Sequence, residues 1–130
     1  MPLDAVSLVQ ALAADGDDVE GMLVVGLDRE RRVCGVAINP HHRALSFMKV
    51  WELEALLQEL EACSLVVGLF RPGPVRKPTM HEVEAFVDLR ARAHRAQVSL
   101  DDCIVARGGR TWSLSELTFV DHDQQEQIPR

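Results

Sequence analysis

The sequence predicts a single α/β domain in which a mixed β-sheet is flanked by helices. Stretches with a helical spacing of apolar residues alternate with apolar runs of strand length, which is typical of an α/β fold. The chain has 130 residues, of which 47% are hydrophobic, and this length suits one domain with its own core. Neither an internal repeat nor an interior linker interrupts the pattern. We therefore expect one domain over residues 1–120, followed by a polar C-terminal tail over residues 121–130.

The first elements are predicted to be a helix and a β-hairpin. In the string "PLDAVSLVQALAADG" the apolar residues recur at helical spacing, with Asp4 placed as N-cap and Gly16 placed to end the helix. Residues 22–27 and 33–38 are rich in β-branched side chains, and the charged string "DRERR" lies between them. Two such runs joined by a polar turn indicate a hairpin.

The middle of the chain predicts a short strand, a helix and a buried strand. The short strand is expected over residues 44–47. Residues 49–62 are amphipathic, because one helical face carries Val50, Leu53, Leu57 and Leu60. Residues 64–70, "SLVVGLF", form a continuous apolar run of strand length, as expected for a strand that is buried on both faces.

A long helix is predicted after a loop that contains three prolines. It is expected over about residues 79–97, since Thr79 can cap it and Glu82 completes a capping box. We expect this helix to pack on one face of the sheet and the helix of residues 49–62 on the other. The remaining strings predict a strand in "VSLDDCIVA", a turn at "RGGR" and a strand end in "TWSLSEL".

The charge balance argues against a general nucleic-acid binder. The chain has 14 basic and 20 acidic residues and a formal net charge of −6. Such a chain lacks the basic face that displaces counterions from a nucleic acid. Nucleic acid is therefore not an expected partner.

The N-terminus and the cysteines indicate the compartment. No basic region followed by an apolar one opens the chain, and no apolar run approaches the roughly 20 residues of a membrane helix. Cys34, Cys63 and Cys103 are an odd, widely spaced set, which indicates free thiols in a reducing compartment. We therefore expect a cytoplasmic protein without membrane contact, and we expect each cysteine to be a small buried side chain.

Three strings carry a resemblance to a known family: "WELEALLQELEACSLVVGL", "LFRPGPVRKPTMHE" and "LDDCIVARGGRTWSL". From about residue 19 to 117 the chain resembles the RadC-like branch of the JAB/JAMM (MPN) superfamily. In that family an apolar strand leads to His-x-His-Pro, a glycine-containing loop and Pro-Ser-x-x-Asp at the start of a long helix. Pro72 and Pro78 match the two prolines, and Thr79 stands at the serine. Further matches are Leu100, Asp101, Gly109, Arg110, Trp112, Ser113 and Leu114.

The resemblance implies a mixed sheet packed against helices in a cytidine-deaminase-like arrangement, and many family members are zinc-dependent peptidases or isopeptidases. Here the residues of the metal motif are replaced: the two histidine positions are Leu69 and Arg71, and the aspartate position is Glu82. One carboxylate does not hold zinc, which needs three protein ligands in a catalytic site. The catalytic glutamate would fall near Gly35 or Val36, and neither can take a proton. The resemblance therefore implies a catalytically inactive domain without metal or other cofactor.

The expected function is protein binding or a scaffold role. An alternative is a JAMM-type hydrolase with a non-standard site built from Glu82, Asp101, Asp102 and a nearby histidine. A further alternative is a RadC-type protein associated with DNA repair, which only the family label suggests.

A protein or peptide partner is expected at the former active-site groove, which would be edged by Phe70, Arg71, Pro72, Val75, Arg76 and Thr79. Phe70 would anchor a peptide segment or a second copy of the domain. A homodimer is favoured over a monomer because it is the default assembly of chains that self-associate. Leu69 and Phe70 can instead point into the core, since they end a buried strand. Arg71 can pair with Glu82 in the place of a metal, or it can point to solvent and leave Glu82 as a capping partner only.

Other constellations give weaker predictions. A relocated metal site would draw on the histidines, which we expect on the polar surface: His41, His42, His81, His94 and His122. Cys103 beside Asp102 is expected to be a packed thiol and not a nucleophile, because neighbouring carboxylates raise a thiol pKa. Trp51 and Trp112 are expected to be core or half-buried anchors.

Overall fold

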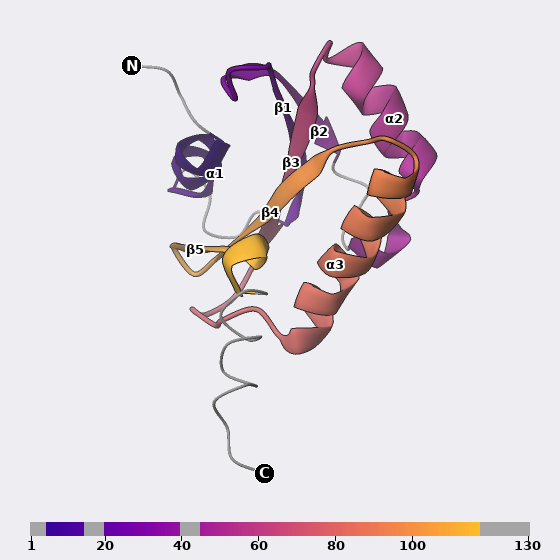
Figure 1. The fold of residues 1–130 in the computed structure, drawn as a ribbon. Coiled ribbons are helices and arrows are strands. Elements are labelled where there is room, and N and C mark those ends of the chain that lie inside the picture. Colours follow the sequence, from indigo (N-terminus) through magenta and orange to yellow (C-terminus); the bar gives the residue numbers. More distant parts are fainter. Residues whose placement is uncertain (1–4, 15–19, 40–44, 118–130) are drawn as a thin grey trace.

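The chain forms an α/β fold with one five-stranded mixed sheet, as predicted (Figure 1). The computed structural model describes residues 5–14, 20–39 and 45–117. The order of elements is α1 (Ala5–Ala14), β1 (Gly21–Leu27), β2 (Val33–Asn39), η1 (Leu45–Phe47), α2 (Val50–Glu59), β3 (Ser64–Arg71), α3 (Met80–Arg95), β4 (Leu100–Arg107) and β5 (Arg110–Ser113).

The strand order in the sheet is β2-β1-β3-β4-β5. Strand β1 is antiparallel to both β2 and β3, β3 and β4 are parallel, and β5 is antiparallel to β4. The parallel pair β3 and β4 has its two carboxyl ends at the same edge of the sheet, where Arg71 lies opposite Arg107. This edge is where α/β sheets commonly place a site.

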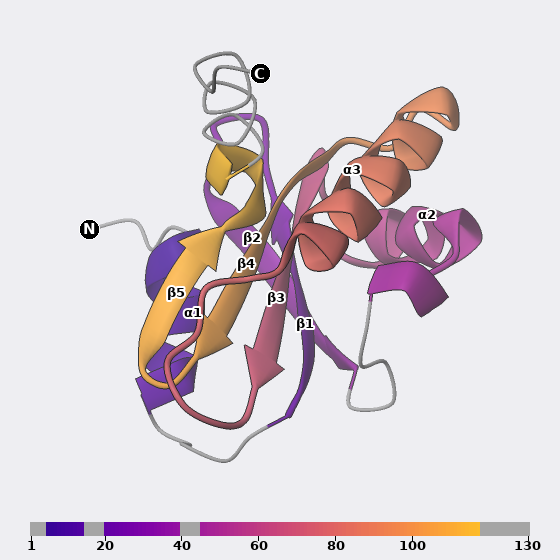
Figure 2. The ribbon, with the colours of Figure 1, turned by 90° about the horizontal axis from the view of Figure 1, so that it is seen from below.

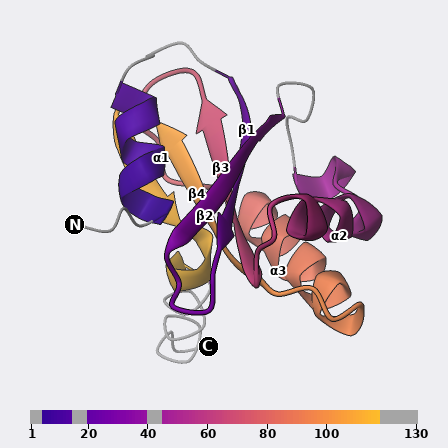
Figure 3. The same cartoon turned by 90° about the horizontal axis from the view of Figure 1, so that it is seen from above.

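Helices α2 and α3 cover one face of the sheet and α1 covers the other (Figure 2; Figure 3). The expectation that the helix of residues 49–62 packs opposite the long helix is therefore wrong. The reason is topological. The connection from β2 to β3 through α2 and the connection from β3 to β4 through α3 advance in the same direction along the sheet. Right-handed crossovers that advance in one direction place their helices on one face.

Two apolar clusters fill the layers on either side of the sheet. Beneath α2 and α3, Leu53 and Phe86 pack on inward residues of the strands such as Val67. Beneath α1, Val9 packs on Leu23 and Ile104. Because β1 and β3 lie between these two layers, nearly every side chain of both strands is buried, which confirms the strand predicted from "SLVVGLF".

Most element boundaries agree with the sequence prediction. The hairpin of β1 and β2 is confirmed, and so is the turn between β4 and β5, where Gly108 and Gly109 have φ values of 61° and 81°. The short strand expected over residues 44–47 is wrong, because residues 45–47 form the 3-10 helix η1. Asp4, Gly16 and the expected tail over residues 121–130 lie outside the described residues.

Two of the three cysteines are not buried, contrary to expectation. Cys103 is fully buried in β4, but Cys34 and Cys63 are exposed. Cys34 lies on β2, which has no neighbour on its outer side in the sheet, and Cys63 lies in the turn before β3. An outer strand and a turn have fewer neighbours to cover a side chain than an inner strand has.

The two tryptophans also differ from each other. Trp51 is 68% exposed on α2, so the expectation of a core or half-buried anchor is wrong for it. Trp112 is partly buried, and the guanidinium of Arg110 lies 5.5 Å from the centre of its ring.

Candidate functional site

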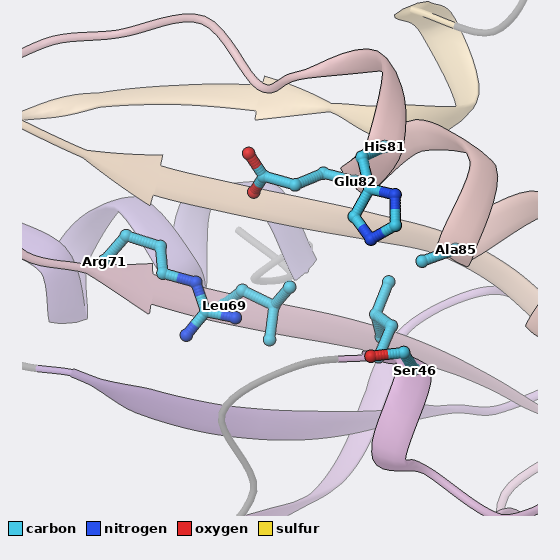
Figure 4. A pocket seen from close by; sticks show the side chains of 7 residues that line it. Ser46, Leu69, Arg71, His81, Glu82 and Ala85 are labelled. Carbon is cyan, nitrogen blue, oxygen red and sulfur yellow. The ribbon is translucent and has the colours of Figure 1, made fainter.

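A pocket lies where the carboxyl end of β3, the first turns of α3 and the helix η1 meet (Figure 4). It has about 330 Å³ of empty space, part of which is open to solvent. We call it the β3–α3 pocket, and its lining residues are Leu45, Ser46, Leu69, Arg71, His81, Glu82 and Ala85. The three positions that the resemblance would assign to a replaced metal motif, Leu69, Arg71 and Glu82, are among them.

The alternation of side chains along β3 decides which residues face the pocket. Leu69 and Arg71 are two residues apart on the strand, so their side chains point to the same face. Phe70 points to the opposite face, where it packs in the cluster beneath α1 and is 9% exposed. Phe70 is therefore a core residue and does not anchor a partner at this pocket.

The first turn of α3 holds Glu82 by the predicted capping box. The Oγ1 atom of Thr79 accepts a hydrogen bond from the backbone N–H of Glu82 at 3.2 Å. In return, the Oε1 atom of Glu82 accepts from the backbone N–H of Thr79 at 3.1 Å. The reciprocal bonds satisfy two backbone donors that a helix start otherwise leaves unpaired.

Glu82 also forms an ion pair, but with Arg107 and not with Arg71. An Nη2 atom of Arg107 lies 3.2 Å from Oε2 and 3.4 Å from Oε1 of Glu82. The Arg107 side chain is only 6% exposed, and its Nη1 donates to the backbone carbonyl of Arg76 at 3.0 Å. The suggestion that Arg71 replaces the metal as the partner of Glu82 is therefore wrong, because β4 supplies the charge.

Among the described residues, Arg71 has no charged partner in the pocket. It is half-buried, and within the part of the chain that the structure describes no hydrogen bond or ion pair engages its guanidinium. Among the residues that the structure describes, two guanidinium groups and one carboxylate meet here, and their charges sum to one positive unit. The arrangement therefore favours an anion in the pocket.

The loop between β3 and α3 forms an exposed rim and does not extend the pocket. Pro72, Val75, Arg76 and Thr79 are exposed and do not line the β3–α3 pocket. The backbone of Val75 packs tightly on Gly108 of the β4–β5 turn. Together with the bond from Arg107, this contact fixes the loop to the end of β4.

The two aspartates of β4 do not join Glu82. Adjacent residues on a strand point to opposite faces, so Asp102 points away from the side on which Cys103 is buried beneath α3. The carboxylate of Asp102 accepts hydrogen bonds from the backbone N–H groups of Cys103 and Ser115, at 2.7 Å and 3.0 Å. Asp101 pairs with Arg31 of the β1–β2 turn at 3.0 Å. Both carboxylates have structural partners, which disfavours a hydrolytic site built from them.

Only one of the histidines that the structure describes reaches the pocket. His81 lines it, whereas His94 lies farther along α3, and His41, His42 and His122 are outside the described residues. Within residues 5–14, 20–39 and 45–117, no three His, Cys, Asp or Glu side chains are grouped as metal ligands would be. Gly35 and Val36, the expected positions of the lost base, lie on β2 and do not line the pocket.

Arg107 belongs to this site although the sequence did not predict it. It ends an apolar run and precedes a glycine turn, so it was expected only to be part of that turn. Its place at the site follows from the parallel pairing of β3 and β4, which brings their carboxyl ends together and which neither segment reveals by itself. Arg71 and Arg107 each end such a strand.

Comparison with known proteins adds no relative: no family model matches the sequence, and a search of curated proteins finds no match. The helices in the described part of the chain are all too short or too polar to cross a membrane.

The thiol of Cys103 is expected to be unreactive in the folded protein. Burial raises its pKa well above the ordinary value, and the charge of Asp102 raises it further, while Arg71 acts in the opposite direction. We expect iodoacetamide to label Cys34 and Cys63 in the native state and Cys103 only after unfolding, as measured by peptide mass spectrometry. The raised pKa means that the folded state favours the neutral thiol. The contribution of this thiol to the free energy of unfolding is therefore fully present below about pH 8.5, and it decreases as the pH rises further. Rapid native labelling of Cys103 would contradict its position in the core.

Proposed function

We propose that the chain is a catalytically inactive JAMM-like domain that binds a protein or peptide segment without a metal. One observation carries the proposal: Leu69, Arg71 and Glu82, the positions of the lost metal motif, line the same pocket. The strand, loop and helix that bring these three residues together follow one another in the order that the resemblance implies, which supports the proposal. The JAB/MPN arrangement of the sheet and helices is part of this proposal.

The side chains of the pocket do not fit a catalytic zinc ion. Leu69 has no lone pair, and the guanidinium of Arg71 is a permanent cation without an acceptor atom. The carboxylate of Glu82 is engaged by Thr79 and Arg107. His81 remains as a single imidazole, whereas a catalytic zinc ion needs three protein ligands and a water molecule. A binding role uses the same pocket and needs none of these ligands.

The partner in this proposal is a segment that enters the pocket. A homodimer was favoured as the default assembly, with Phe70 as the anchor of a second copy, but Phe70 is buried on the other face of the sheet. Without that anchor, the features that remain for recognition are the charge of Arg71, the hydroxyl of Ser46 and the ring of His81. They suit a short polar group better than a broad apolar interface.

Restoring two histidines tests the proposal directly. The purified chain is expected to contain no stoichiometric zinc and to show no peptidase activity. In the double variant Leu69→His and Arg71→His, two imidazoles would point to the same face beside Glu82, so we expect zinc binding to appear. At zinc concentrations about a hundredfold above Kd, the folded state should gain about 2.7 kcal/mol, measured by denaturant unfolding with and without zinc.

A matched control places the second histidine outside the pocket. The double variant Leu69→His and Arg76→His has the same number of histidines and the same change in the core, but residue 76 lies on the exposed loop. It should show no comparable response to zinc. If zinc stabilises the two variants equally, the assignment of Leu69 and Arg71 to the metal motif is refuted. If the unaltered chain binds a zinc ion tightly, the proposal that the domain is inactive is refuted.

A further inference from the structure

We infer that the β3–α3 pocket binds a carboxylate group that carries a short aliphatic chain. The inference rests on the proposed binding function and names the chemistry of its ligand. The carboxylate can belong to the C-terminus of a peptide or to a free small acid, since both present the same group.

The unpaired guanidinium of Arg71 supplies the main attraction. Arg71 and Arg107 end neighbouring parallel strands at the same register, yet in the described part of the chain a single carboxylate, that of Glu82, pairs with either of them. Arg107 is buried and holds Glu82 with two contacts, so Glu82 is not available to Arg71. A guanidinium presents parallel N–H donors that match the two oxygens of a carboxylate.

Two further polar side chains line the same space. The hydroxyl of Ser46 comes from η1 and the imidazole of His81 comes from the first turn of α3, on either side of the pocket (Figure 4). Neither has a hydrogen-bond partner among the residues that the structure describes, so each can donate to a ligand. Hydrogen-bond donors from η1, α3 and β3 therefore surround the β3–α3 pocket.

The charge of the pocket suits a singly charged ligand. The two guanidinium groups exceed the one carboxylate by a single positive charge, which one carboxylate neutralises. A doubly charged phosphate would lie beside the carboxylate of Glu82 without a second free cation, and this repulsion disfavours it.

The size and the floor of the pocket suit a short aliphatic group. Leu45, Leu69 and Ala85 supply apolar surface beneath the polar side chains. The cavity volume of about 60 Å³ is well below the range for drug-sized ligands, so only a group of a few atoms fits inside it. A ligand with a few carbon atoms next to its carboxylate would cover this floor while its charge reaches Arg71.

The test compares carboxylates with neutral molecules of the same shape. The probes are isovalerate against isovaleramide, and acetyl-Gly-Val with a free C-terminus against its C-terminal amide. Binding is followed by amide chemical shifts of the ¹⁵N-labelled full chain. We expect each carboxylate to bind at least about tenfold more tightly than its amide, since charged hydrogen bonds are lost in the amide. The shifts should be largest at the end of β3 and the start of α3.

A pair of arginine variants provides the control. Arg71→Gln should weaken carboxylate binding to the level of the amides, whereas Arg76→Gln, on the exposed loop outside the pocket, should leave it unchanged. Tighter binding of the peptide than of isovalerate assigns the site to a chain terminus, and the reverse assigns it to a free acid.

Three results would overturn the inference: equal binding of acids and amides, equal loss in both arginine variants, or tighter binding of inorganic phosphate than of isovalerate. If one of these results is found but the Leu69→His and Arg71→His variant binds zinc, the inference about a carboxylate ligand is refuted and the proposed function still stands.

Discussion

Replacing Arg107 by methionine is expected to lower the free energy of unfolding by about 2–3 kcal/mol, because the change removes the buried partner of a partly buried ion pair. Arg107 is 6% exposed and contacts both carboxylate oxygens of Glu82. It also donates to the carbonyl of Arg76, so the variant loses the bond that attaches the loop before α3 to β4. Urea denaturation followed by circular dichroism measures the loss.

Arg71→Met is the matched control for this prediction. Arg71 ends the neighbouring strand at the same register, but no hydrogen bond or ion pair within the described residues holds its guanidinium. Its replacement should cost less than about 1 kcal/mol, as for surface charges in general.

Glu82→Gln keeps an acceptor for the capping box. Adding it to Arg107→Met should recover about 1–3 kcal/mol, since the unpaired carboxylate is removed. Equal losses for Arg107→Met and Arg71→Met would show that the ion pair contributes nothing.

Gly108→Ala is expected to destabilise the fold by about 3 kcal/mol, from backbone strain and a steric clash together. Gly108 has a φ of 61°, a conformation that residues with a Cβ atom adopt only at a cost. A Cβ atom at this position would lie 2.4 Å from the backbone nitrogen of Val75. The clash is with backbone, so the whole loop between β3 and α3 must move. Chemical denaturation gives the free energy, and amide shifts of the loop report the movement.

Gly109→Ala separates the strain from the clash. Gly109 has a φ of 81°, but a Cβ atom there would meet nothing within 4 Å. This variant should lose only the cost of the left-handed conformation, about 1–2 kcal/mol, and the loop should stay in place. If both glycine variants lose the same free energy, the contact between Gly108 and Val75 does not constrain the loop.

The sequence alone determined the local structure of this protein. The capping box of Thr79 and Glu82 depends on residues three apart, and the structure contains both of its hydrogen bonds. The continuous apolar run of β3 correctly indicated a strand buried on both faces. The hairpin and the glycine turn after β4 were predicted for the same reason. In each case the determining interactions lie within a few residues, where propensity and periodicity act.

Only the tertiary structure decided which charges meet. Charge pairing between strand ends depends on the strand order and register, and neither is encoded in the spacing of residues along one segment. The parallel alignment of β3 and β4 placed Arg107 opposite Arg71, and the burial of Arg107 gave it the carboxylate of Glu82. The common direction of the two crossovers placed α2 beside α3 on one face of the sheet. As a consequence Arg71 has no ion-pair partner within the described residues, because a single carboxylate cannot neutralise two guanidinium groups.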